Sequence, residues 1–123
     1  MFGKIIEGGQ RALDLFVRRH GLLAQNIAHL ETPGYRPKDL DFQSALEAAF
    51  EPQGPGAAAS ALGSDGHVVT DTRTAAGRDG NAVDLDRESA KIAQNSLRYD
   101  ATTRIIAHKL AALKFVVSDG GRP

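Results

Sequence analysis

Three acidic residues near the second half of the chain are the closest candidates for metal chemistry. Asp84, Asp86 and Glu88 are spaced two positions apart, but the further oxygen ligands and the glycine of a calcium loop are missing. An aspartate at a helix N-cap and acidic residues in the first turn explain the same spacing, because they oppose the helix dipole. We therefore predict a helix start here and no metal site.

The histidines do not predict a metal or catalytic site either. They are far apart in the sequence and lack zinc spacing, at His20, His29, His67 and His108. The phosphate-binding loop of nucleotide hydrolases, the glycine pattern of dinucleotide sites and the nucleophile elbow of acyl-transfer enzymes are missing from the sequence. We expect no catalytic residue and no cofactor, and we interpret the chain as a non-enzymatic protein.

Charge and hydropathy exclude further classes of partner. Fifteen basic and fifteen acidic residues are interspersed, which argues against a nucleic-acid partner. No stretch approaches the roughly 20 apolar residues of a membrane span, so direct membrane insertion is not expected. Residues 1–9 include Lys4 and Glu7 and lack the apolar core of a secretory signal, so no cleaved signal peptide is expected.

Residues 1–35 are predicted to form a long helix and a turn. Apolar residues recur three and four positions apart, as in a coiled-coil-like seam, at Leu13, Phe16, Leu23, Ile27 and Leu30. His20 occupies an intervening seam position and is expected to be packed or partly buried. The helix should end near Leu30 or Glu31, because Pro33 biases Thr32 away from the helical region. Pro33 and Gly34 suit the centre of a type II turn.

The middle of the chain is predicted to be less regular. Residues 36–50 should contain a short helix, capped by Asp39 or Asp41, with one apolar face. Residues 51–82 are rich in glycine, proline, alanine and serine, which predicts a flexible insert. Only residues 67–74 have the β-branched content of a strand, so at most one β-hairpin is expected.

Residues 83–123 are predicted to form the longest helix, roughly 50 Å at 1.5 Å per residue, with Asp84 as its N-cap. Its seam alternates spacings of four and three, at Leu85, Ser89, Ile92, Ser96, Tyr99, Thr103, Ile106, Leu110, Leu113 and Val117. The second half of this seam is the more apolar and should pair with the first helix. The predicted fold is mainly α: long N- and C-terminal helices pair in a coiled-coil-like inner shell, beside a short third helix and the insert.

Such a helix pair buries little apolar surface, too little to offset the entropy of ordering the chain. We therefore predict that stability comes from assembly, although a self-sufficient antiparallel hairpin stays open as an alternative. The residues expected at the assembly interface are Leu13, Phe16, Leu23, Ile27, Leu30, Ile92, Tyr99, Ile106, Leu110, Leu113 and Val117.

Several stretches resemble the flagellar axial proteins, which are the rod, hook and filament-junction subunits. Residues 25–35 contain Asn-Ile-Ala followed by Thr-Pro-Gly-Tyr, which is similar to the signature of that family. Residues 35–42, 83–88 and 97–99 are similar to its short proximal-rod branch. Two departures are Ser89, where that branch usually has methionine, and residues 29–31, which replace a more usual asparagine-containing stretch.

This resemblance implies a structural subunit of the proximal rod that polymerises helically, transmits torque and lines the export channel. The implied partners are further copies of the chain, adjacent rod proteins, the rod-base or MS-ring junction protein and the flagellar type III export apparatus. The implied location is the periplasmic part of the basal body, reached without a cleaved signal peptide. Structural roles are implied for Asn26, Thr32, Pro33, Gly34 and Tyr35. Another rod subunit of the same family, or a cytosolic coiled-coil adaptor or oligomer, remains an alternative.

Overall fold

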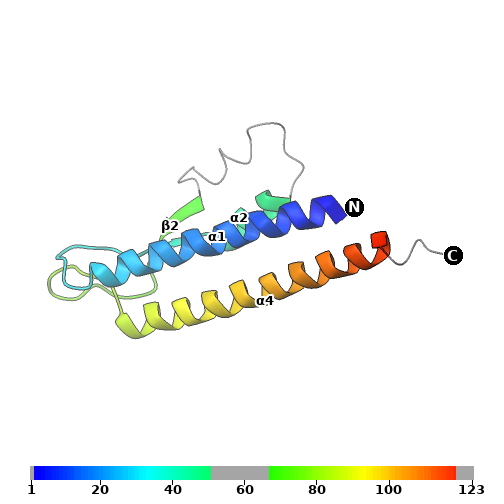
Figure 1. The fold of residues 1–123 in the computed structure, drawn as a ribbon. Helices are drawn as coiled ribbons and strands as arrows, with labels where there is room; N and C mark the ends of the chain where they lie inside the picture. The colour runs from blue at the N-terminus through cyan, green and yellow to red at the C-terminus, as the bar shows by residue number, and fades with distance from the viewer. Residues whose placement is uncertain (1, 51–66, 119–123) are drawn as a thin grey trace.

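Two long antiparallel helices dominate the computed structural model, which describes residues 2–50 and 67–118 (Figure 1). Helix α1 spans Phe2–Ala28 and helix α4 spans Leu85–Ser118, and the start of α1 lies at the same end as the end of α4 (Figure 1). The short helix α2 (Phe42–Phe50) and strands β1 (Lys38–Leu40) and β2 (Val68–Thr70) lie beside α1. The predicted mainly α fold with long terminal helices is confirmed. Within the described ranges, no helix combines the length and hydrophobicity of a membrane span.

Helix α1 is amphipathic, and its apolar stripe supplies most of the core. Ala12, Leu15, Phe16 and Leu23 are buried, at the spacings of three, four and seven that fall on one helix face. The Phe16 ring stacks on the Phe42 ring of α2 with 4.6 Å between centroids. Beneath α2 the core is completed by Leu40, Ala45 and Ala49. Contrary to expectation, His20 is exposed.

Helix α1 ends at Ala28, slightly earlier than predicted, and passes into the predicted turn. The Leu30 N–H donates to the Ile27 carbonyl at 3.1 Å, a three-residue bond that tightens the last turn. The Tyr35 N–H donates to the Thr32 carbonyl at 3.2 Å, and Gly34 has a φ of +74°. A positive φ at the third residue is typical of a type II turn, so the role expected of Gly34 is confirmed.

Strands β1 and β2 form a two-stranded antiparallel sheet in which Lys38 pairs with Thr70 and Leu40 with Val68. β2 lies within the stretch predicted from its β-branched residues. Its partner β1 lies in the connection between the turn and α2, where no strand was predicted. Part of the predicted insert, residues 51–66, lies outside the described residues.

Aspartates form the N-caps of α4 and α2. Oδ1 of Asp84 accepts hydrogen bonds from the N–H groups of Asp86 at 3.0 Å and Arg87 at 3.2 Å, which confirms the predicted cap. At α2 the cap is Asp41, whose carbonyl accepts the Ala45 N–H at 3.0 Å. The alternative cap, Asp39, instead contacts Arg19. The Asp84 side chain thus satisfies two first-turn N–H groups of α4, and Oδ1 of Asp41 accepts the Ser44 N–H of α2 at 3.5 Å.

The face that α4 turns toward α1 differs from the predicted seam. Ile92, Ile106 and Leu113 are half-buried as expected, but the positions between them are exposed, at Ser89, Ser96, Thr103 and Leu110. The residues one position earlier face α1 instead: Glu88 and Asn95 are buried, and Thr102 is half-buried. The predicted seam is thus correct at three positions of one edge, although Leu85 and Tyr99 of that edge are exposed. It is wrong along the other edge, because the residues buried there are polar.

Candidate functional site

Asn26 joins three elements at the end of the hairpin where α1 turns toward β1. Its fully buried side chain donates from Nδ2 to the Lys38 carbonyl at 2.7 Å and to Oε2 of Glu88 at 2.9 Å. Its Oδ1 accepts the Lys38 N–H at 2.9 Å and the Tyr35 hydroxyl at 3.1 Å. All four hydrogen-bonding positions of the amide are used, so Asn26 ties α1 to β1 and α4.

A group of charged residues is joined to this asparagine through Glu88 and is called the ion cluster below. It consists of three carboxylates and three cations: Asp39, Asp71, Glu88, Arg19, Arg87 and Lys91. Nζ of Lys91 lies 2.9 Å from Oε1 of Glu88 and 2.9 Å from Oδ2 of Asp71. Arg19 binds Asp39 through Nε at 2.9 Å and Nη2 at 3.2 Å. The charges balance, which allows them to be buried together.

The pKa values of the cluster fit this charge pairing. Burial would raise the pKa of Asp71, but hydrogen bonds from the Arg73 N–H, Lys91 and Arg87 lower it well below its usual range. Burial would lower the pKa of Lys91, but Glu88 and Asp71 raise it above its usual value. Asp71 and Lys91 are therefore both charged at neutral pH.

Tyr35 is the neutral contributor to this region. Its burial, and the nearby charge of Glu88, raise the pKa of its hydroxyl above the usual value. The hydroxyl therefore stays protonated and can donate to Asn26. The Tyr35 ring also stacks on the His29 ring, with 4.5 Å between centroids.

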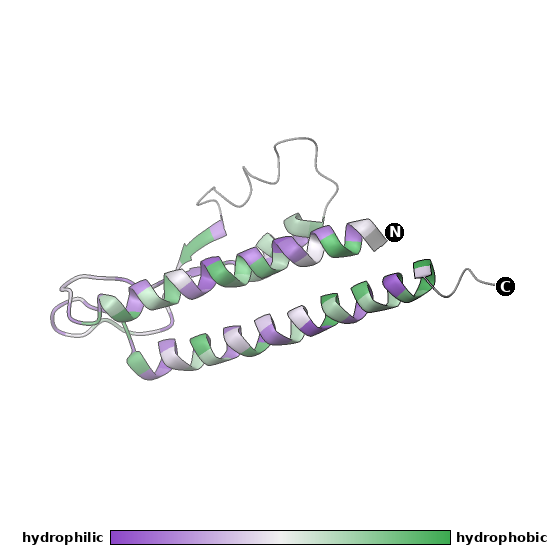
Figure 2. Ribbon diagram, viewed as in Figure 1, coloured by the Kyte–Doolittle hydropathy of each residue, from purple (hydrophilic) through white to green (hydrophobic). Residues whose placement is uncertain are grey.

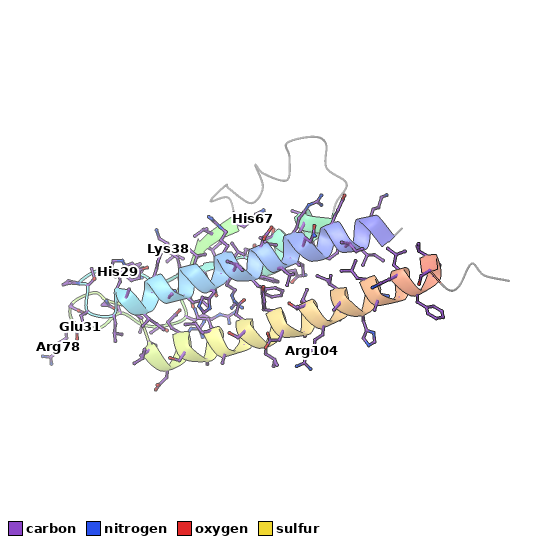
Figure 3. The ribbon with its side chains drawn as sticks, viewed as in Figure 1. His29, Glu31, Lys38, His67, Arg78 and Arg104 are labelled. Carbon is purple, nitrogen blue, oxygen red and sulfur yellow. The ribbon has the colours of Figure 1, made fainter. Side chains whose placement is uncertain are left out.

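The turn at residues 32–35 is fastened to the segment that precedes α4. Nδ2 of Asn81 donates to the carbonyls of His29 at 2.9 Å and Thr32 at 2.7 Å, which satisfies acceptors after the end of α1. The Gly34 N–H donates to the Asp79 carbonyl at 2.9 Å. Figure 3 shows His29, Glu31 and Arg78 together at this end of the molecule. The closed end of the hairpin is thus held by side chains and backbone alike.

The motif residues therefore differ in burial. Asn26 is fully buried and Tyr35 is half-buried, whereas Thr32, Pro33 and Gly34 are exposed at the turn. Their neighbours in the ion cluster were missed by the sequence analysis. Glu88 had been singled out only as a first-turn residue of α4, and Asp39 only as a possible helix cap. The partner of Glu88, Asn26, lies 62 positions away.

The predicted interface residues also differ in how exposed they are. Phe16 and Leu23 are buried within the chain itself. Half-buried positions are Leu13, Ile27, Leu30, Ile92, Ile106 and Leu113. Tyr99, Leu110 and Val117 are exposed, and these offer the most free surface to a neighbour.

Further apolar side chains are exposed on α4 that the predicted seam did not include: Leu97, Ile105, Phe115 and Val116. Green bands toward the C-terminal end of α4 in Figure 2 show how hydrophobic residues gather there. Arg104 projects from α4 away from α1 (Figure 3). The hydrophobic sequence from Phe115 to Val117 could have indicated this surface, since apolar patches on a protein surface often mark contacts with partners.

Metal chemistry has no support at the acidic residues near the start of α4. Among the described residues, no group of three His, Cys, Asp or Glu side chains is arranged to hold a metal ion. Asp84 caps α4, and Glu88 points inward to Asn26 and Lys91. The geometry therefore indicates a scaffold whose polar interior fixes two helices together.

No family model matches the chain. It is, however, similar along most of its length to curated proteins named flagellar basal body rod protein FlgB. The protein from Aeromonas hydrophila is 34% identical over 120 residues, which cover 91% of this chain and 91% of that protein. The protein from Salmonella typhimurium strain LT2 is 32% identical over 125 residues, which cover 90% and 91%.

The chain belongs to the FlgB family of flagellar basal body rod proteins. A more distant FlgB from Borreliella burgdorferi is 26% identical over 131 residues, covering 94% of this chain and 97% of that protein. The resemblance to the proximal-rod branch of the flagellar axial proteins is thereby confirmed. Both helices of the hairpin, and the turn that follows α1, lie within a chain that matches FlgB almost end to end.

Proposed function

We propose that this FlgB-family chain is a subunit of the proximal rod that polymerises helically, transmits torque and lines the export channel. Similarity to FlgB proteins over about nine-tenths of the chain carries this proposal. It favours a rod subunit over a cytosolic coiled-coil adaptor or oligomer, for which the heptad spacing alone would suffice.

The helical hairpin suits a mechanical role. A rod that turns as a unit needs subunits whose parts do not slide past one another. The ion cluster and Asn26 hold α1 and α4 in one register at the closed end, and the apolar side chains of α4 remain exposed for neighbours. Contacts between unlike surfaces of successive copies would build an open helical array.

The proposed partners follow from the same family membership. They are further copies of the chain, adjacent rod proteins, the rod-base or MS-ring junction protein and the type III export apparatus. The proposed location is the periplasmic part of the basal body, reached by export without a cleaved signal peptide. The assembly interface is proposed to include the exposed predicted residues Tyr99, Leu110 and Val117.

Complementation tests this proposal. The chain would be expressed in a motile bacterium from which the FlgB gene has been deleted, and swimming and the composition of isolated basal bodies would be measured. We expect restored swimming and the chain in the rod fraction. Basal bodies that form without the chain would overturn the proposal.

An interface variant extends the test to the proposed contact surface. Leu110 is 46% exposed, so Leu110→Asp should leave the isolated helix pair folded but stop rod growth by placing a charge in an apolar contact. Leu110→Met is the matched control, because it keeps the hydrophobicity and approximate volume. If Leu110→Asp and Leu110→Met cells swim equally well, Leu110 is not at the interface.

A further inference from the structure

The last residues of α4 extend beyond the start of α1. Oε2 of Glu88 is bonded to Asn26, Nδ2 of Asn95 donates to the Phe16 carbonyl at 2.9 Å, and the Ile106 side chain packs over Gly9. If this pairing continues in the same register, Phe2 at the start of α1 lies level with Leu113. The residues after Leu113 therefore project past the first residue of α1, as the right-hand end of Figure 1 shows.

This projecting end, residues 114–118, is called the overhang, and it is apolar. Phe115 is 62% exposed, Val116 56% and Val117 77%. Three consecutive large apolar side chains on a helix point in different directions around its axis, so a neighbour must wrap around the helix to cover them. The overhang thus calls for a concave partner surface.

The same chain has a concave apolar surface of this kind. A groove of about 250 Å³ lies where α1, α2 and α4 meet near the open end of the hairpin. Its apolar lining includes Ile5, Ile6, Leu46, Phe50, Ile105 and Ile106. Phe50, one of its lining residues, is 54% exposed, so the described residues 2–50 and 67–118 leave part of the groove uncovered.

The overhang cannot fill the groove of its own molecule. Ile106 lines the groove, and Phe115 lies nine residues further along the same straight helix, or about 13 Å at 1.5 Å per residue. A continuous α-helix does not fold back on itself over that distance. An overhang can therefore reach this groove only from a second molecule.

Size and charge fit the overhang of a second copy. A cavity of about 150 Å³ holds a benzene molecule, so a groove of about 250 Å³ has room for the Phe115 ring and part of a valine. Lys114 adjoins Phe115, and the exposed carboxylate of Glu47 lies next in sequence to the groove residue Leu46. Glu7 lies 3.8 Å from Arg11 of its own helix, and Lys109 also lines the groove, so Glu47 is the carboxylate of one copy with which Lys114 of the next can pair.

We propose that the overhang of one copy inserts into the groove of the next copy, with Phe115 as the buried anchor. This inference rests on the proposed function, because it names one contact within the rod. The two surfaces are unlike, so a single contact of this kind leaves a free overhang on one copy and a free groove on the other, to which further copies can add. Three side chains bury far less than the roughly 1,200 Å² of a stable interface, so the contact should form only together with the other contacts of the rod.

Disulfide cross-linking in isolated basal bodies tests the contact. The natural chain has no cysteine, so Ile5→Cys combined with Val117→Cys introduces the only two thiols of the chain and leaves Phe115 and Phe50 in place. Within one molecule Ile5 is level with Leu110, so the two positions are about 10 Å apart along the helix axis, too far for a disulfide. After mild oxidation we expect a ladder of dimers, trimers and larger species of this chain.

Two comparisons make the result decisive. Leu97→Cys with Val117→Cys is the control pair, because Leu97 is 71% exposed on α4 but does not line the groove. Adding Phe115→Ser to the chain with Ile5→Cys and Val117→Cys should reduce the amount of cross-linked species at least about tenfold, because it removes an aromatic anchor of the contact. Adding Phe115→Leu instead should retain most of the cross-linking. A ladder no stronger than that of the control pair, or cross-links only to a different protein, would overturn the inference.

The outcomes also separate this inference from the proposed function. If the unmodified chain restores swimming and is present in basal bodies but the ladder is missing, the overhang contact is wrong and the rod assignment stands. If the unmodified chain is missing from basal bodies that have formed, the rod assignment itself fails.

Discussion

Asn26 and Glu88 meet inside the protein although 62 positions separate them in the sequence. Nδ2 of Asn26 donates a 2.9 Å hydrogen bond to Oε2 of Glu88, and neither residue has any exposed surface. The bond links the end of α1 to the start of α4. A sliding of one helix by a single residue would break it and leave two buried polar groups unpaired, so the pair sets the register of the hairpin.

Asn26→Ala should destabilise the chain strongly. It removes the four hydrogen bonds of the Asn26 side chain, so the Glu88 carboxylate and the Lys38 N–H each lose one hydrogen-bond partner. We expect the free energy of unfolding to fall by about 2–4 kcal/mol, measured by urea denaturation with circular dichroism. The neighbouring Gln25→Ala, at an exposed position, should change it by no more than about 0.5 kcal/mol. Equal midpoints for the two variants would contradict the role of Asn26.

Lys91→Met should show whether the ion cluster works as a unit. The substitution removes the cation that Glu88 and Asp71 share, each at 2.9 Å. A buried carboxylate left without its counter-ion should lower the free energy of unfolding by about 3 kcal/mol. Glu88→Gln added to Lys91→Met should recover part of this loss, because the uncompensated charge is gone. Arg98→Met, on the exposed surface of α4, is the control. No recovery in the double variant would argue against direct coupling.

The pKa shifts predict how stability depends on pH. The lowered pKa of Asp71 contributes stability above its unfolded value near 4, and this contribution is lost as the pH falls below that value. The raised pKa of Lys91 contributes stability below its unfolded value near 10.4, which is lost as the pH rises through the folded value. Between about pH 5 and pH 9 these two contributions should be constant.

Asp71→Asn isolates the acidic side of this dependence. The variant should be less stable than the natural chain at pH 7. The difference should shrink at pH 3, because the Asp71 carboxyl of the unfolded chain is then mostly protonated, which favours unfolding of the natural chain, whereas the folded chain holds it ionised. Thermal unfolding at both pH values measures it. A difference that stays the same at pH 7 and pH 3 would show that the charge of Asp71 does not matter.

Gly9 is predicted to be a point of close approach between α1 and α4. A Cβ atom at this position would lie 2.7 Å from Cδ1 of Ile106, so Gly9→Val forces the Ile106 side chain to move. We expect a loss of about 1–3 kcal/mol in the free energy of unfolding, as for other overpacked sites. Gly3→Val is the matched control, because a Cβ atom there meets nothing within 4 Å. Equal stability of both variants would mean that α4 adjusts freely at this end.

Local sequence signals predicted the helices and the turn well. Apolar residues three and four positions apart marked α1, Asp84 marked the start of α4, and Pro33 with Gly34 marked the turn, because each of these signals acts within a few residues. β2 was also predicted from its β-branched residues. Its pairing with β1 was not, because strand pairing depends on contacts far along the chain.

The buried face of α4 could be predicted only in part. Ile92, Ile106 and Leu113 were identified by hydrophobicity, but Glu88 and Asn95 were not included in the seam because polar residues are usually exposed. Their burial depends on partners in α1, and a single sequence does not show which distant residues pair. The ion cluster was missed for the same reason, since its members come from α1, α4, β1 and the segment after β2.

The density of basal bodies isolated from complemented cells tests the central claim most directly. The account predicts that the proximal rod contains copies of this chain as antiparallel α1–α4 hairpins, with Asn26 opposite Glu88 and with the ends of neighbouring copies in contact. A rod that contains the chain with its two helices separated, or a proximal rod formed without the chain, would contradict it.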